Sequence, residues 1–130
     1  MNYAPQSRVV QKETEVLLGQ PANYPSEMVS ALTALLKKHT VIKSAYLCLM
    51  HDKSLNDKPS LLVGFEGNGD LAEAMKEAGT VAADTAPKGV PVDLVVLKKG
   101  DSEVSEYMFK SVKPFYERTL STKFRSLFGS

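Results

Sequence analysis

Four short stretches of the chain carry the hydrophobic pattern of β-strands. They span residues 14–18, 41–51, 60–66 and 92–97, and glycine, proline or charged residues follow each of them. Residues 60–66 form the densest apolar run and are predicted to be the central strand. Residues 41–51 are apolar on both faces. Alternation assigns Ala45, Leu47 and Leu49 to one face and Ile42, Tyr46, Cys48 and Met50 to the other.

Apolar residues at helical spacing predict three helices between and after these strands. The first begins at Ser26, which is expected to be its N-cap. The second begins at Asp70, where Asp-Leu-Ala-Glu has the pattern of a capping box, and it must end before Pro87. The third is expected to be capped by residues 101–103 and to end at Pro114.

The elements follow one another in the order strand, helix, strand, strand, helix, strand. This is the order of a ferredoxin-like βαββαβ unit, so we expect an α+β fold with an antiparallel sheet and both helices on one face. Another α+β arrangement of the same elements is the alternative. A chain of 130 residues has the size of one domain. We assign residues 13–130 to that domain and residues 1–12, which are polar and mixed, to a flexible N-terminal arm.

The second face of such a sheet would expose apolar side chains, among them Leu17, Val95 and Leu97. Burial stabilises by about 25 cal/mol per Å² of apolar area, so this face is expected to have a cover. Residues 115–128 are the available segment, because they have one apolar helical side and the last 24 residues hold six of the ten aromatics. We predict a C-terminal amphipathic helix over this face. Without it, self-association into a homodimer through the face is the remaining explanation.

Net charge and cysteine content restrict the classes of function. A formal net charge of +1 gives no general reason to expect nucleic acid or a membrane as partner. The longest apolar run, residues 45–50, is far too short to cross a bilayer. Cys48 is the single cysteine, which excludes an internal disulfide and a zinc site built on cysteine pairs. Because the first residues also lack an apolar stretch, we expect a cytoplasmic protein.

Several segments match, in order, the pattern of a known family. They are Leu-Gly-Gln-Pro at 18–21 with Tyr-Pro at 24–25, Ala-Tyr-Leu at 45–47, the run at 59–66, Pro-Val-Asp at 91–93 and Pro-Phe-Tyr-Glu-Arg at 114–118. In this order the chain resembles the C-terminal domain of the SseB family, the enhanced serine sensitivity proteins of bacteria. The resemblance implies a bacterial, cytoplasmic protein and supplies no catalytic residues. SseB-like domains also look similar to small proteins found beside secreted toxins, which implies a protein partner such as a toxin, as in toxin immunity, or a metabolic enzyme.

The Pro-Phe-Tyr-Glu-Arg motif contains most of the candidate partner-binding residues. Phe115 and Tyr116 supply rigid apolar area, and Arg118, next to Glu117, offers a planar fork for a carboxylate or phosphate. The alternative is structural: the two aromatics attach the C-terminal segment to the sheet, and the two charged residues pair with each other. Tyr24 belongs to the same site if its loop lies nearby.

The other residues with reactive side chains do not form a pattern typical of catalysis or metal binding. Asp93 interrupts an apolar strand and is expected to be hydrogen-bonded or at a strand edge. His39 and His51 fall at a helix end and a strand end without a carboxylate pattern. Cys48 alternates with apolar neighbours, as a core thiol does. We therefore predict no catalytic residue, no metal and no cofactor.

These patterns favour a non-enzymatic domain that binds a protein partner. The alternative is a domain that senses a small ligand, an amino acid or similar anion, held near Arg118 between the sheet and the C-terminal segment.

Overall fold

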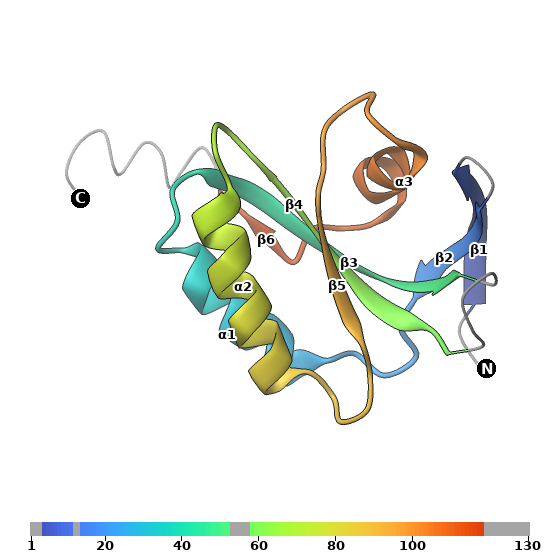
Figure 1. Ribbon diagram of the computed structural model, residues 1–130, viewed down its shortest axis with the longest axis horizontal. Helices are drawn as coiled ribbons and strands as arrows, with labels where there is room; N and C mark the ends of the chain where they lie inside the picture. Colours follow the sequence, from blue (N-terminus) through green and yellow to red (C-terminus); the bar gives the residue numbers. More distant parts are fainter. Residues whose placement is uncertain (1–3, 12–13, 53–57, 119–130) are drawn as a thin grey trace.

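The computed structural model of the chain describes residues 4–11, 14–52 and 58–118. The strands are β1 (Ala4–Gln11), β2 (Thr14–Gln20), β3 (Ile42–Asp52), β4 (Ser60–Gly67), β5 (Val92–Val96) and β6 (Tyr116–Glu117). The helices are α1 (Ser26–Leu36), α2 (Ala72–Thr85) and α3 (Glu103–Ser111). The strands form one sheet in the order β1-β2-β3-β4-β5, with β6 paired to β3 (Figure 1). All pairs are antiparallel except β4 and β5, which are parallel.

Helices cover both faces of this sheet. Helices α1 and α2 lie side by side on one face, and α3 lies on the other (Figure 1). The α1–α2 cluster of buried side chains contains Met28, Leu32, Leu36, Ile42, Ala45, Leu47, Leu49, Leu61, Val63, Phe65 and Tyr116, among others. The α3 cluster contains Val16, Leu18, Tyr46, Cys48, Leu62, Leu97, Val104, Tyr107, Met108 and Val112. Because β3 and β4 are covered on both sides, their sequences are almost continuously apolar.

The ferredoxin-like arrangement is wrong, although the α+β class and the order of β2, α1, β3, β4, α2 and β5 along the chain are as predicted. In a split βαβ unit another strand lies between the two parallel strands. Here β4, α2 and β5 form an unsplit unit, because β5 pairs directly with β4. The strand β2 instead pairs with β3, so the sheet follows the sequence order from one edge to the other.

The N-terminal residues extend the sheet beyond β2. Residues 4–11, which we assigned to an arm, form β1 and pair antiparallel with β2. Pairing of residues 11 and 14 places the two strands in a tight hairpin. The strand β2 therefore pairs with β1 on one side and β3 on the other. In the predicted sheet, which began at residue 13, β1 was absent.

A bulge near the start of β3 places Ile42 on the face opposite to the predicted one. The register against β4 shifts between Ile42 and Ser44. One inserted residue reverses the side on which the preceding side chains lie. Ile42 therefore packs with Ala45 in the α1–α2 cluster, whereas Tyr46 and Cys48 lie in the α3 cluster as predicted.

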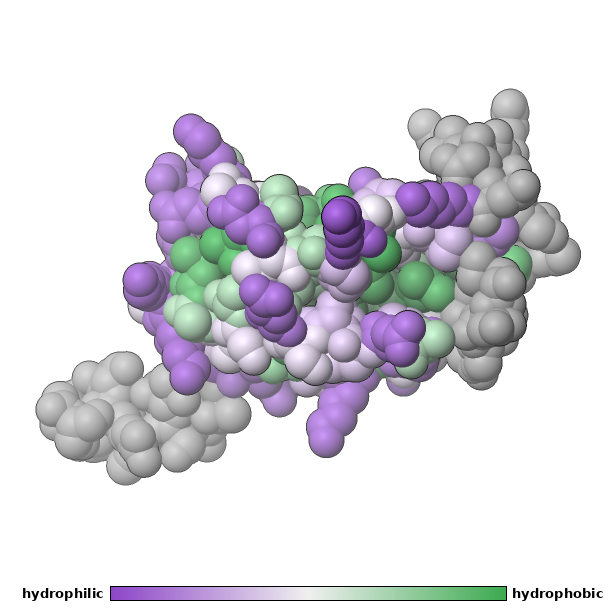
Figure 2. Space-filling model, turned by 90° about the horizontal axis from the view of Figure 1, so that it is seen from below, coloured by the Kyte–Doolittle hydropathy of each residue, from purple (hydrophilic) through white to green (hydrophobic). Residues whose placement is uncertain are grey.

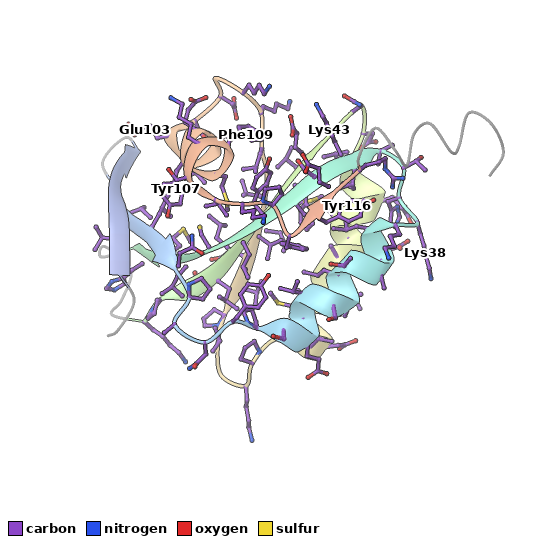
Figure 3. All side chains as sticks on the ribbon, turned by 180° about the vertical axis from the view of Figure 1, so that it is seen from behind. Lys38, Lys43, Glu103, Tyr107, Phe109 and Tyr116 are labelled. Atoms are coloured by element: carbon purple, nitrogen blue, oxygen red, sulfur yellow. The ribbon has the colours of Figure 1, made fainter. Side chains whose placement is uncertain are left out.

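Helix α3 covers the face for which we expected the C-terminal segment. Val104, Tyr107 and Met108 are buried in the α3 cluster together with residues of β2 and β3. The ring of Phe109 meets that of Tyr46 edge to face, with 5.6 Å between centroids. Figure 3 shows Tyr107 and Phe109 on this helix, on the opposite side of the sheet from α1 and α2.

Two details of the predicted second face are also corrected. The β2 residues in the α3 cluster are Val16 and Leu18, and Leu17 is not among them. Tyr116 is buried in the α1–α2 cluster, and residues 116–117 form a strand rather than part of a helix. The rest of the predicted helix, residues 119–128, lies outside the described residues.

Candidate functional site

Strand β6 attaches the Pro-Phe-Tyr-Glu-Arg motif to β3. The paired residues are Ala45 with Tyr116 and Ser44 with Glu117. The backbone N–H of Phe115 donates to the carbonyl of Ala45 at 2.9 Å, and that of Arg118 donates to the carbonyl of Lys43 at 2.8 Å. The strand β2 pairs with residues 49–52 of β3, and β6 pairs with residues 44–45. Both therefore lie along the same edge of β3, with β6 nearer the start of the strand. The motif is therefore part of the sheet.

Arg118 binds the carboxyl end of α1. Its guanidinium donates to the carbonyl oxygens of Leu36 at 3.3 Å, His39 at 3.4 Å and Ile42 at 3.3 Å. The last carbonyls of a helix lack intrahelical partners, and a cation there also interacts favourably with the helix dipole. The guanidinium carbon lies 5.9 Å from the centroid of the Tyr116 ring, within the range of a cation–π contact.

These bonds support the structural interpretation of the motif, with a different partner for its arginine. Tyr116 is buried and docks the segment, as that interpretation expected. The guanidinium of Arg118 donates to backbone carbonyls, whereas the adjacent Glu117 is exposed. In Figure 3, Tyr116 lies between β3 and the helices, and Lys38 and Lys43 are labelled toward the end of the molecule where Arg118 bonds.

Tyr24 and Phe115 border a common pocket. Tyr24 has a relative exposure of 56% and lies in the loop between β2 and α1. The pocket has a volume of about 260 Å³ and is lined by Gln20, Tyr24, Leu47, Val112, Lys113, Pro114 and Phe115. We call it the Tyr24 pocket. It joins three segments that are far apart in the sequence: the loop before α1, the middle of β3 and the chain after α3.

The structure therefore divides the five predicted residues into two groups. Tyr24 and Phe115 are brought together at the pocket. Tyr116 and Glu117 form β6, and Arg118, which follows them, bonds to the end of α1. Gln20, Val112 and Lys113 also line the pocket and were missed. Gln20 lies in the Leu-Gly-Gln-Pro segment of the family pattern, which was the signal that could have identified it.

The remaining polar candidates have internal partners. The exposed Asp93 accepts a hydrogen bond from Ser60 Oγ at 3.1 Å. Its strand, β5, is the last of the sheet, so Asp93 is both hydrogen-bonded and at a sheet edge, the two environments that its position predicted. Nε2 of His39 lies 2.8 Å from Oε1 of Glu77 on α2, a carboxylate that the sequence did not identify because 38 residues separate the pair. Hydrogen bonding to His39 lowers the pKa of Glu77.

Cys48 is a buried free thiol. Burial in the α3 cluster raises the pKa of the Cys48 thiol to about 12, so it stays protonated at neutral pH as a core thiol. Within residues 4–11, 14–52 and 58–118, no group of three or more His, Cys, Asp or Glu side chains could hold a metal ion. Within the same ranges, no helix is both long enough and apolar enough to cross a membrane.

Comparison with known proteins adds the family. Residues 10–118 match the SseB protein C-terminal domain, which covers both the pocket and the Arg118 contacts. The chain belongs to this family. Over 103 residues it is 35% identical to Protein SseB of Escherichia coli (strain K12) and to Protein SseB of Shigella flexneri. The matched region is 79% of this chain and 40% of each relative, so the chain matches less than half of their length. No solved structure matches the chain.

Proposed function

We propose that this SseB-family domain is a non-catalytic module that binds a protein partner through the Tyr24 pocket. The observation that carries the proposal is the exposure of Tyr24. Among residues 16–51 and 58–118, it is the large hydrophobic side chain that is left exposed, and it stands at the rim of a pocket rather than alone on the surface. Exposed aromatic side chains beside an apolar pocket are typical of protein contact sites.

The composition of the pocket fits a protein contact. Tyrosine presents an apolar ring and a polar hydroxyl at a small cost in conformational entropy, which suits it to the centre of an interface. Leu47, Pro114 and Phe115 give the pocket an apolar lining. Gln20 and Lys113, which are exposed, supply polar groups at its edge. An apolar centre with a polar rim is the usual organisation of a binding surface.

Two observations favour a protein over a small ligand. Pockets for small molecules usually have volumes of about 300–1,000 Å³, and the Tyr24 pocket is smaller, at about 260 Å³. The Arg118 guanidinium, which would have held an anion, donates to three carbonyl oxygens of the chain itself. The partner classes implied by the family resemblance, a bacterial toxin or a metabolic enzyme, are the first to test.

The test is capture of partners on the immobilised domain, compared between the unchanged chain and Tyr24→Ala. We expect the variant to lose the proteins captured from a bacterial lysate, because truncation of a central aromatic costs about 2 kcal/mol or roughly thirtyfold in Kd. The affinity of each captured protein is then measured by titration calorimetry.

Asn23→Ala is the matched control, since Asn23 is an exposed neighbour in the same loop that does not line the pocket. Its affinity should equal that of the unchanged chain. Equal capture by all three proteins, with circular dichroism showing intact folds, would place the binding surface away from the Tyr24 pocket.

A further inference from the structure

The open edge of β5 offers backbone hydrogen-bonding groups that the described chain does not use. The sheet ends at β5, which pairs only with β4 in the described strand order. Toward β4, the N–H of Leu97 donates to the carbonyl of Phe65, and the carbonyl of Pro91 accepts from Leu61. Because alternate residues of a parallel strand face the same neighbour, the N–H and C=O groups of residues 92, 94 and 96 point to the open edge.

The side chains of the same three residues form one wall of an apolar groove. Val92, Leu94 and Val96 are partly buried against the α1–α2 cluster. A hollow of about 490 Å³ lies between Val92, Leu94 and the second half of α2, whose contributions include Gly79, Ala82 and Ala83. A second hollow, of about 510 Å³, lies between Val96 and the start of α2. We call these together the β5–α2 groove.

The surface beside the turn from α2 to β5 is partly apolar. Figure 2 views the molecule from the side on which α2 and the turn from α2 to β5 project. Green and white surface continues across this face and is interrupted by separate purple side chains. A sheet edge with free backbone groups and apolar side chains readily pairs with another strand.

The two ends of the β5–α2 groove carry opposite charge. The hollow at Val92 has Lys88 as its one charged lining residue. The hollow at Val96 has Asp70, Lys98 and Asp101, with a net charge of −1. An occupant that runs along the groove therefore needs an acidic group at the Val92 end and a basic group at the Val96 end.

A second copy of this chain meets both requirements. A two-fold axis at Leu94 would pair β5 antiparallel with its copy, so that Val92 faces the partner's Val96 and the outward N–H and C=O groups bond reciprocally. The Lys88 end of each copy then meets the end of the other that carries Asp70, Lys98 and Asp101, whose net charge is −1. Asp93 faces the partner's Val95, so the two carboxylates are not directly opposite each other.

From this self-complementarity we infer that the β5 edge is a homodimer interface that joins two sheets into one. The Tyr24 pocket shares no lining residue with the β5–α2 groove, so the dimer leaves both copies of the pocket available. The interface also differs from the sheet face that the sequence suggested for self-association, since α3 covers that face.

Sedimentation equilibrium of the full chain, with Lys88→Glu, Asp101→Lys and the double variant, tests the inference. Both residues are exposed, so the fold should tolerate each change. We expect the unchanged chain to form a dimer that weakens with added salt, and each single variant to raise the dimer Kd roughly tenfold. The double variant exchanges the charges between the two ends and should restore the Kd to within about threefold of the original.

Lys76→Glu is the matched control, because it makes the same charge change on α2 at an exposed residue that lines neither hollow. A chain that is monomeric at every concentration would overturn the inference, and so would a dimer that responds equally to the control. A dimer in which the double variant is no better than the single ones would place the interface elsewhere.

Discussion

The guanidinium of Arg118 adds a charged donor to carbonyl oxygens at the end of α1 and just beyond it. The helix ends at Leu36, and the chain then passes His39 before it enters β3. Hydrogen bonds in which one partner is charged stabilise by about 1.5–3 kcal/mol, more than bonds between neutral groups. Arg118 is partly buried, which reduces but does not abolish competition from water. The residue therefore joins the last described part of the chain to its first helix.

Arg118→Ala should lower the free energy of unfolding by about 2 kcal/mol, because the carbonyls of Leu36, His39 and Ile42 lose a charged donor and the first two keep only a backbone N–H. Arg118→Lys should be intermediate, since an ammonium keeps the charge near the helix end but cannot reproduce the planar fork. Urea denaturation measures both values.

Lys38→Ala is the control for the Arg118 variants. It removes a positive charge at the same helix end from an exposed side chain and should change the free energy of unfolding by less than about 0.5 kcal/mol. An Arg118→Ala protein with unchanged stability and lost partner binding would assign Arg118 to the contact site instead.

The N-caps distinguish the helices from one another. The side chain of Ser102 accepts a hydrogen bond at 3.1 Å from the backbone N–H of Ser105, so the N-cap of α3 is Ser102, one of the residues 101–103 that were predicted to cap it. Asp70 was predicted to be the N-cap of α2, but Leu71 holds that position and Asp70 precedes it. The carboxylate of Asp70 still accepts a hydrogen bond at 2.9 Å from the backbone N–H of Ala72, the first residue of the helix. Ser26 makes no capping bond, because α1 begins at Ser26 itself and Pro25 occupies the N-cap position.

The two serines provide a paired prediction. Ser102→Ala should lower the free energy of unfolding by about 1 kcal/mol, because the N–H of Ser105 loses its acceptor. Ser26→Ala should have an effect below about 0.5 kcal/mol, since its exposed side chain caps nothing. Thermal unfolding of both variants gives the comparison, and an equal loss from both would refute the difference between the caps.

The sequence predicted elements better than their arrangement. Hydrophobic periodicity located β2 to β5 and all three helices, because burial on one or two faces leaves a local pattern. It could not show that β5 pairs with β4, since strand order depends on contacts between distant residues. It also could not show the bulge at Ile42, which reverses a side chain without changing the composition of the strand.

The candidate site shows the same division. The motif at residues 114–118 was recognisable, but its separation into a pocket residue, a buried tyrosine and a helix-capping arginine depends on the fold.

Gly64 is a further example of a residue whose contact depends on the fold. An added Cβ would lie 2.7 Å from Cδ1 of Leu97, so this glycine allows the side chain of Leu97 to cross the central strand. The apolar sequence around Gly64 gives no sign of that contact.

Two truncations separate the contribution of residues 114–118 to stability from that of residues 119–130. Truncation after Lys113 removes Tyr116, β6 and the Arg118 bonds. It should lower the free energy of unfolding by about 3–5 kcal/mol, from one buried aromatic side chain and the lost hydrogen bonds. Denaturant unfolding with a dye for exposed apolar surface measures this.

Truncation after Arg118 is the matched comparison. It retains β6 and the helix cap, and α3 already covers the second face of the sheet, so we expect a loss below about 1 kcal/mol. A large loss on removing residues 119–130 would support the predicted C-terminal helix as an additional cover.

The bonds between Arg118 and the end of α1 can form only late in translation. His39 and Arg118 are 79 residues apart, so at roughly 5–20 residues per second the ribosome needs about 4–16 s to reach the arginine after the histidine. A helix forms and melts in about 1 μs or less. The end of α1 therefore opens and closes many times before the arginine that bonds to it is synthesised.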